Sequence, residues 1–383
     1  MDVNDLLRIA VENGASDLHL KVGSYPMIRV GGALVPADES KRLTSDDLVT
    51  MSAAIMSSAQ QAVQKFKDAN EVDLAYGVPG LGRFRCNVFQ QRGSIGVVLR
   101  VIPKDIRTIA ELDLPPVLKT IASEQRGLVL VTGTTGSGKS TSLAAMIDHI
   151  NRTRCVHVMT VEDPIEFLHR DDRSIINQRE VAVDTRSFAQ ALRSALRQDP
   201  DVILVGEMRD FETIETALLA AETGHLVFST LHTLDATETI NRIISVFPPH
   251  QQKQVRIQLA SVLKAVVSQR LVPRADGNGR APAVEVMITT PFIRDCIVDK
   301  ERTHQIPGAI AAGTSQYGMQ TFDQSLFGLY QAGRVSYDEA LRWASNVDEF
   351  KLKVQGIATT ADMSRDQMAG SAVGAPEITR FNR

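Results

Sequence analysis

The chain has few cysteines, no charge excess and no long apolar run, and each absence excludes a class of protein. Its three cysteines, Cys86, Cys155 and Cys296, stand apart among 383 residues. They form neither a CxxC pair for zinc nor the even set of a disulfide framework, so we expect a reducing compartment. Lys and Arg number 42 against 45 Asp and Glu, a formal net charge of −3. This balance argues against a protein that mainly neutralises a nucleic-acid backbone.

The sequence also lacks the patterns of a secretory signal and of a membrane span. Its first residues, MDVNDLLRIAVENG, carry acids where a signal peptide carries bases. No apolar run approaches the roughly 20 residues of a transmembrane helix. We therefore expect a cytoplasmic protein that can dock on a membrane protein. Hydrophobic residues at 43% and charged residues at 23% are typical of a globular chain, and its length predicts two or three domains.

Residues 1–103 predict a small mixed α+β domain. Apolar spacing favours helices near residues 6–10 and 48–66, with short strands around them. The clearest element is a hairpin over 82–102, which turns at Gln91-Arg92-Gly93-Ser94. Because strand side chains alternate, Arg83 and Arg85 share the face opposite Phe84, Cys86 and Val88.

A connector and a larger α/β domain follow. Prolines at both ends indicate a linker over 104–114. A core over 115–290 follows, in which short β-branched runs alternate with amphipathic helices from Gly127 to about Gln269. This alternation predicts a mostly parallel sheet with helices on both faces. The predicted strands are 128–132, 156–161, 202–206 and 226–230.

The residue pattern in the rest of the chain predicts helices followed by a tail. A turn at Asp276–Gly279 precedes a helical region over 291–358, in which Ser336 and Glu339 match a capping box. Residues 359–383 are small, polar and aperiodic, which predicts a flexible tail.

One motif carries the clearest chemistry. It matches G-x-x-x-x-G-K-[ST] between a predicted strand and a predicted helix. Glycines let backbone N–H groups approach phosphate oxygens, and the helix directs its positive end at the anion. The motif predicts ATP with Mg²⁺: Lys139 faces the β- and γ-phosphates, Ser140 the metal and Thr141 the α-phosphate. Its residues are Gly133, Thr134, Thr135, Gly136, Ser137, Gly138, Lys139 and Ser140.

Carboxylates at the ends of two other strands indicate which reaction follows. Glu162 ends one strand and Glu207 follows another. Ligands of open α/β sheets lie at the carboxyl ends of the strands, so both side chains should face the triphosphate. One would hold the Mg²⁺ shell and the other would orient water. An alternative is that the Asp163-Pro164 pair only forms a turn.

Four sequence blocks together resemble the secretion ATPase superfamily, and within it the PilT-type retraction ATPases of type IV pili. The resemblance extends to about residue 345. The blocks are the phosphate motif, TVEDPIEF (160–167), ILVGEMRD (203–210) and AAETGHLVFSTLHT (220–233).

The resemblance implies a role for each site residue. Glu162 is the carboxylate that activates water, and Glu207 acts on Mg²⁺ and the γ-phosphate. His232, and more weakly His225, would sense the γ-phosphate. The arginines that would reach the phosphates when two domains close are Arg83 and Arg85, with Arg92 and Arg100 as weaker candidates.

The resemblance also implies a fold and partners. The fold is an N-terminal PAS-like α+β domain followed by a RecA-like P-loop ATPase domain with a helical C-terminal part. Six copies would form a ring that powers pilus retraction and twitching motility. The partners implied are an inner-membrane platform protein and, indirectly, the pilin fibre, with the motor held peripherally at the inner membrane and no nucleic acid bound.

Two features bear on the branch of the family. Retraction motors carry an AIRNLIRE-like segment, of which PFIRDCIVD (291–299) keeps Ile293, Arg294 and Ile297. Assembly and secretion relatives often carry a tetracysteine zinc insertion, which three separated cysteines cannot build. Pilus assembly or type II secretion stays open as an alternative. Further alternatives are a RecA-like nucleic-acid motor, a switch that does not hydrolyse nucleotide, and a small-molecule kinase.

Overall fold

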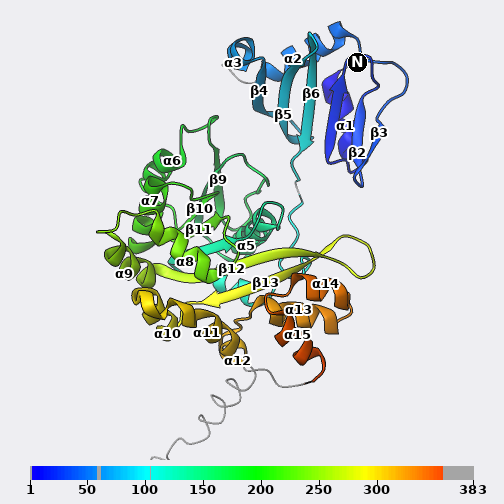
Figure 1. The fold of residues 1–383 in the computed structure, drawn as a ribbon. Helices are drawn as coiled ribbons and strands as arrows, with labels where there is room; N and C mark the ends of the chain where they lie inside the picture. Colours follow the sequence, from blue (N-terminus) through cyan, green and yellow to red (C-terminus); the bar gives the residue numbers. More distant parts are fainter. Residues whose placement is uncertain (1, 58–61, 104, 357–383) are drawn as a thin grey trace, which may run out of the picture. The chain divides into compact units, whose positions relative to one another are not determined.

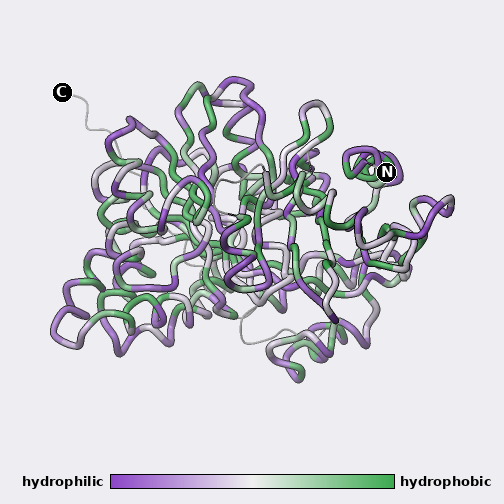
Figure 2. Tube along the Cα trace, turned by 90° about the horizontal axis from the view of Figure 1, so that it is seen from above, coloured by the Kyte–Doolittle hydropathy of each residue, from purple (hydrophilic) through white to green (hydrophobic). Residues whose placement is uncertain are grey.

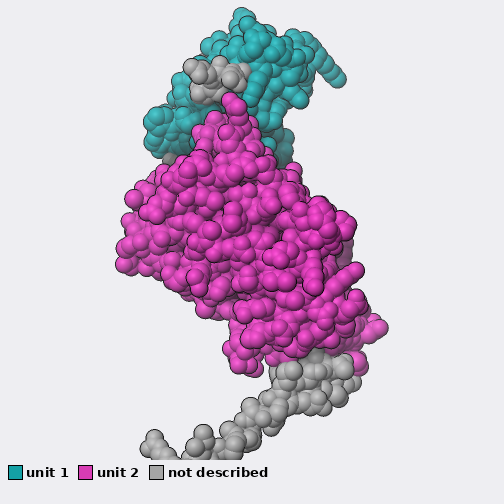
Figure 3. All heavy atoms as spheres, turned by 90° about the vertical axis from the view of Figure 1, so that its left-hand side faces the viewer, with its two compact units in different colours: residues 1–105, 166–168 teal, residues 106–165, 169–383 magenta. Residues whose placement is uncertain are grey.

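The computed structural model describes residues 2–57, 62–103 and 105–356. The chain divides into two compact units, which Figure 3 colours separately. Unit 1 comprises residues 1–105 and 166–168, and unit 2 comprises residues 106–165 and 169–383. Each unit is described by itself below. The flexible tail predicted over 359–383 lies outside the described residues.

Unit 1 is an antiparallel sheet with helices packed on one of its faces. The strand order is β3-β2-β1-β6-β5-β4. Helix α1 buries Val3, Leu6, Leu7 and Ala10, the apolar stripe of the helix predicted near residues 6–10. The elements are α1 Val3–Glu12, β1 Asp17–Lys21, β2 Met27–Val30, β3 Ala33–Pro36, α2 Ser45–Met56, α3 Ala62–Ala69, β4 Glu71–Val78, β5 Gly82–Gln91 and β6 Ser94–Val101.

The predicted hairpin is present as β5 and β6. Gln91 pairs with Ser94, which leaves Arg92 and Gly93 as a two-residue turn. Both turn residues have positive φ, 48° and 75°, as the tight turn of a twisted hairpin requires. Phe84, Cys86 and Val88 are fully buried, whereas Arg85 is exposed on the opposite face. The predicted alternation is therefore confirmed.

Unit 2 is built on a mostly parallel sheet, as the sequence predicts. Its strand order is β13-β12-β7-β11-β10-β8-β9, and only the β12–β13 pair runs antiparallel. The four predicted strands appear as β7, β8, β10 and β11. The strands are β7 Gly127–Thr132, β8 His157–Glu162, β9 Ile175–Glu180, β10 Val202–Val205, β11 Leu226–Leu231, β12 Leu263–Pro273 and β13 Arg280–Ile288.

Helices cover both faces of this sheet, and each face has its own apolar core. Helices α4 and α5 pack against one face, and α7, α8, α9 and α10 (Pro291–Val298) pack against the other. Figure 2 shows hydrophobic and hydrophilic stretches alternating along the coiled parts of the chain, as amphipathic helices require. The central helices are α4 Val117–Ala122, α5 Lys139–Thr153, α6 Phe188–Ala195, α7 Phe211–Glu222, α8 Ala236–Ser245 and α9 Gln252–Val262.

Three strands of unit 2 were not predicted: β9, β12 and β13. Helix α9 ends at Val262 and β12 begins at the next residue, so no turn marks the change. The predicted turn at 276–279 joins β12 to β13 as a long hairpin beside the C-terminal helices (Figure 1).

The C-terminal region is helical, as expected. Ser336 accepts a hydrogen bond from the Glu339 backbone and so caps α14. Ile293 and Ile297 of the PFIRDCIVD segment are fully buried in α10. The elements are α10 Pro291–Val298, the 3₁₀ helix η1 Lys300–Gln305, α11 Ile306–Ala312, α12 Thr314–Tyr317, α13 Phe322–Gln331, α14 Tyr337–Trp343 and α15 Val347–Val354.

Candidate nucleotide site

The phosphate motif forms the loop between β7 and α5. Gly133, Gly136 and Gly138 have φ of 141°, 79° and 92°, a region that favours glycine. A Cβ at Gly133 would lie 2.4 Å from the Gln269 carbonyl oxygen, and one at Gly138 would lie 2.9 Å from Gln269 Nε2. The glycines are therefore required by backbone conformation and by the close approach of β12.

The side chains of the loop fit a phosphate chain. Lys139 Nζ donates to the carbonyl oxygens of Gly133 and Thr134 at 2.8 and 3.0 Å, which holds its charge over the loop. Ser137 Oγ is buried with no hydrogen-bond partner in the structure. Since buried polar atoms are normally satisfied, this hydroxyl fits a site built for an anionic ligand. The positive end of the 15-residue helix α5 lies beside it.

Sequence reasoning missed the support beneath this loop. Gln269 of β12 is buried and accepts a hydrogen bond from Ser142 Oγ of α5 at 2.8 Å. Its neighbour Ser268 accepts a hydrogen bond from Thr132 Oγ1 at 3.1 Å, at the end of β7. These polar residues brace both ends of the loop. No local motif marks them, because β12 itself was not predicted.

The predicted residues of unit 2 lie along one edge of the sheet. Strands β7, β11, β10 and β8 are parallel neighbours in that order. The segments that follow or end them carry the phosphate loop, His232, Glu207 and Glu162 respectively. Because the carboxyl ends of parallel strands meet at one edge, the fold brings these groups together.

Glu207 and His232 are in direct contact. His232 Nε2 lies 3.2 Å from Glu207 Oε1, and Arg209 Nε lies 2.5 Å from the same oxygen. Burial alone would raise the pKa of Glu207. The hydrogen bond from Arg209 and the charge of His232 outweigh burial and lower that pKa below its ordinary value of 4.5. The carboxylate is therefore ionised at neutral pH. Arg209, within the ILVGEMRD block, was not predicted.

Glu162, at the end of β8, is held by two neighbours. Thr160 Oγ1 and Gln178 Nε2 donate to its Oε1 at 2.7 and 3.1 Å. Gln178 lies on β9, which the sequence did not predict, so neither contact was foreseen.

His225 lies at the opposite edge of the sheet. It precedes β11, whereas His232 follows it. Its Nδ1 lies 2.9 Å from the Ala220 carbonyl oxygen, near the end of α7. It therefore cannot face the phosphate loop of its own chain. In the structure His225 instead contacts the last turns of α7.

The four arginine candidates belong to unit 1. Arg85 is exposed, Arg83 is half-buried, and Arg92 lies in the β5–β6 turn. Arg100 is engaged, because its Nε donates to Asp17 Oδ1 at 2.9 Å. Asp17 accepts a further hydrogen bond from Ser16, and although burial alone would raise its pKa, these contacts lower it.

A buried carboxyl group connects several elements behind the site. Glu285 Oε1 on β13 accepts from the Ala236 backbone N–H at 2.9 Å and from Ser268 Oγ at 3.3 Å. Ala236 begins α8, four residues after His232, and Ser268 contacts the end of β7. Burial raises the pKa of Glu285 to about 7. No sequence pattern identified this residue.

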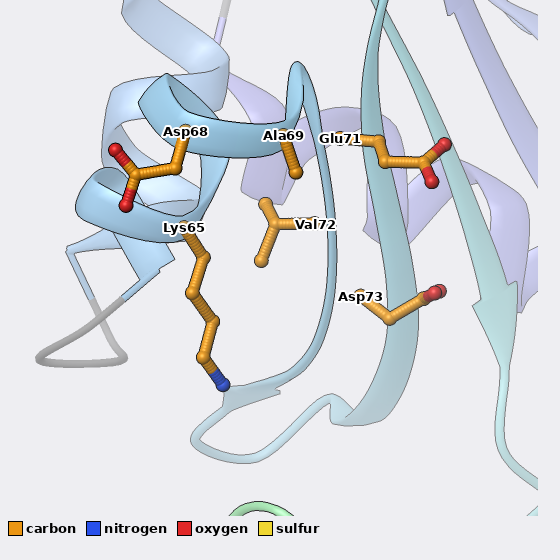
Figure 4. A pocket seen from close by; sticks show the side chains of 6 residues that line it. All are labelled: Lys65, Asp68, Ala69, Glu71, Val72 and Asp73. Atoms are coloured by element: carbon orange, nitrogen blue, oxygen red, sulfur yellow. The ribbon is translucent and has the colours of Figure 1, made fainter.

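A shallow groove in unit 1 contains no predicted site residue. It has a volume of about 400 Å³ and lies between α3 and β4 (Figure 4). Val72 points toward α3, whereas Glu71 and Asp73 point to the other side of the strand. Among the described residues no cluster of three or more His, Cys, Asp or Glu side chains can hold a metal ion. In the same ranges no helix has the length and apolarity to cross a bilayer.

Comparison with known proteins places these features in one family. The model of the family described as "Type II/IV secretion system protein" matches residues 1–351. The chain is 47% identical to the type IV pilus retraction ATPase PilT of Pseudomonas aeruginosa, over 91% of this chain and 100% of the relative. It is 46% identical to a twitching motility protein of Neisseria gonorrhoeae, over 84% of each chain.

A solved structure shares the arrangement of the chain. The crystal structure of the pilus retraction motor PilT with bound ADP has a TM-score of 0.83 and 44% sequence identity to it. The match covers 91% of this chain and 98% of that one.

Proposed function

The chain belongs to the type II/IV secretion system protein family, and from this premise we propose that it is the motor that retracts type IV pili. It is a P-loop ATPase with a mixed α/β fold. The observation that carries the proposal is the single sheet edge at which the phosphate loop, His232, Glu207 and Glu162 meet. Identity of 47% to a retraction ATPase along almost the whole chain supports the retraction branch.

The phosphate loop binds the triphosphate. Backbone N–H groups of residues 133–138 and the start of α5 surround the β-phosphate, and Lys139 neutralises the β- and γ-phosphates. Thr141 meets the α-phosphate. Mg²⁺ would be held by Ser140 and by Glu207, and it would neutralise charge on the phosphate oxygens. Few protein ligands are needed, because Mg²⁺ is usually bound through one or two carboxylates together with substrate phosphates.

Hydrolysis follows from the position of Glu162. Its carboxylate orients a water molecule and accepts its proton as the water oxygen bonds to the γ-phosphorus. The bond from that phosphorus to the β–γ bridging oxygen breaks, and ADP and phosphate leave. His232, in contact with Glu207, senses the γ-phosphate and transmits its loss.

Motion follows from closure between two domains. Unit 1 acts as a PAS-like domain and the core of unit 2 as a RecA-like domain, with the boundaries 1–103, 104–114, 115–290 and 291–358 proposed above. Arg83 and Arg85 reach the phosphates when the domains close, which makes hydrolysis depend on closure. Coupling of this kind is reciprocal, so phosphate loss favours reopening.

The working assembly is a ring of six copies in the cytoplasm. It docks peripherally at the inner membrane on a platform protein, through which it acts on the pilin fibre. The net charge of −3 gives no support for a nucleic-acid track.

Genetic complementation tests this function. A deletion strain would receive either the wild-type gene or the Lys139→Ala variant. We expect the variant strain to be hyperpiliated and unable to twitch. Bald cells would show assembly instead, and unaltered surface fibres would remove the pilus from the proposal.

A further inference from the structure

Two neutral donors hold one oxygen of the Glu162 carboxylate. Thr160 Oγ1 lies 2.7 Å from Oε1, and Gln178 Nε2 lies 3.1 Å from the same atom. Hydrogen bonds to an ionised acceptor are roughly twice as strong as bonds between neutral groups. The terminal torsion of a glutamate is intrinsically broad, so an unbraced carboxylate would rotate. Two donors on one oxygen restrict that rotation.

Strand geometry places these three side chains together. Thr160 and Glu162 are two residues apart on β8, and Gln178 pairs directly with Thr160 across the β8–β9 ladder. On its other side Thr160 pairs with Leu204, which packs in the core that contains α5. The shared face is therefore the one covered by α5, the helix that begins at Lys139.

Both donors are themselves fixed. Thr160 is fully buried, so its hydroxyl has little freedom to turn away. The Oε1 atom of Gln178 accepts a hydrogen bond from the His169 backbone N–H at 2.9 Å. That bond orients the Gln178 amide with its NH₂ group toward Glu162.

We propose that Thr160 and Gln178 are positioning residues for ATP hydrolysis, which fix the Glu162 carboxylate in the orientation that aligns the attacking water. The inference rests on the proposed role of Glu162. Misplacement of a reacting group by about 1 Å can cost roughly 100-fold in rate. Loss of either donor should therefore slow the chemical step and leave ATP binding intact.

Matched variants of the full-length protein test the inference. Thr160→Val removes the hydroxyl at nearly constant volume, and Thr160→Ser restores it. Gln178→Leu removes the amide, and Asn177→Leu is its control on the same strand, since the two side chains point to opposite faces. We expect kcat to fall about 10- to 100-fold in Thr160→Val and Gln178→Leu, with KM and the Kd for ATP unchanged. Thr160→Ser and Asn177→Leu should stay within about 2-fold of wild type.

A second mutant background separates the possible outcomes. If Glu162→Gln keeps the wild-type kcat, the proposed role of Glu162 is wrong and the inference fails with it. If Glu162→Gln retains only a low residual kcat while Thr160→Val and Gln178→Leu keep the wild-type kcat, only the inference is overturned. The expected result is that Thr160→Val lowers kcat in the wild type and adds nothing to Glu162→Gln. An equal additional loss in both backgrounds would indicate a purely structural role and would also overturn it. Gln178→Leu keeps the test available should Thr160→Val fail to fold.

Discussion

His232 Nε2 and Glu207 Oε1 lie 3.2 Å apart, which joins the residues that follow two adjacent parallel strands. Movement or a change of charge at either residue therefore alters the environment of the other. This contact gives the histidine a physical route to the carboxylate proposed to bind the metal. The contact also distinguishes His232 from a histidine that merely ends a strand, because such a histidine has no partner in the site.

Replacing Glu207 by Gln should abolish hydrolysis while leaving the fold intact. The carboxylate is ionised at neutral pH, and the neutral amide cannot supply that charge to the Mg²⁺ proposed to bind there. We expect phosphate release to fall by about 100-fold or more. The measurement is phosphate release at saturating ATP, with the melting temperature as the control for folding. Wild-type turnover in this variant would refute the assignment of Glu207, whereas absence of phosphate release from the wild type itself would favour the switch that does not hydrolyse nucleotide.

A methyl group at Gly133 should be far more damaging than one at Gly136. At Gly133 the added Cβ would lie 2.4 Å from the Gln269 carbonyl oxygen, whereas at Gly136 it meets nothing within 4 Å. Both positions have positive φ, so both variants carry a backbone cost of about 1–3 kcal/mol. We expect Gly133→Ala to lose ATP binding by at least 10-fold beyond Gly136→Ala, as measured by titration calorimetry. Equal affinities would contradict the close packing of β12 against the loop.

The pH dependence of stability should carry the signature of Glu285. Burial raises its pKa from an ordinary 4.5 to about 7. The folded protein therefore binds this proton more tightly than the unfolded chain does. The resulting stabilisation is complete below pH 4.5 and is lost as the pH rises through 7. Glu285→Gln cannot titrate, so it should gain on wild type by up to about 3 kcal/mol between pH 5 and pH 8.

Urea unfolding at several pH values measures this gain. Glu215→Gln, at an exposed position on α7, serves as the control. A stability difference between wild type and Glu285→Gln that stays constant with pH would show that Glu285 is ionised throughout.

Arg85→Ala should impair catalysis without destabilising unit 1. The side chain is exposed on the open face of the sheet, and surface charges contribute about 0–1 kcal/mol. An arginine delivered to a phosphate is worth roughly 10³-fold or more in rate. Arg85→Lys should not restore the activity, since an ammonium cannot reproduce the planar fork of a guanidinium. Steady-state ATPase assays of both variants, with melting curves, decide the point. Full activity in Arg85→Ala would leave Arg83 as the candidate for the arginine that reaches the phosphates.

Features that depend on a local sequence pattern could be predicted from the sequence. Strands β7, β8, β10 and β11 are short apolar runs bounded by turns, and the phosphate motif has fixed spacing, so both could be predicted. The β5–β6 hairpin was predictable because two strand-like runs flank Gln91-Arg92-Gly93-Ser94, where Gly93 readily adopts the positive φ of a tight turn.

The remaining features depend on tertiary contacts. Strand β9 reads IINQRE, which has little apolar alternation, and β12 follows α9 with no break. The side chains of Gln178, Gln269 and Glu285 come from these strands and from β13. Their roles exist only once distant strands are paired, so no spacing rule could identify them.

The junction between α9 and β12 has a mechanical consequence. Arg256 of α9 donates to the Ile297 carbonyl oxygen of α10 at 2.9 Å, and β12 begins directly after α9 and carries Gln269 beneath the glycines. No loop intervenes between α9 and β12, and the pairing of β12 with β7 shifts register between Leu263 and Ala265. A displacement of α10 would therefore pass through α9 to this register shift, at the start of the strand that carries Gln269.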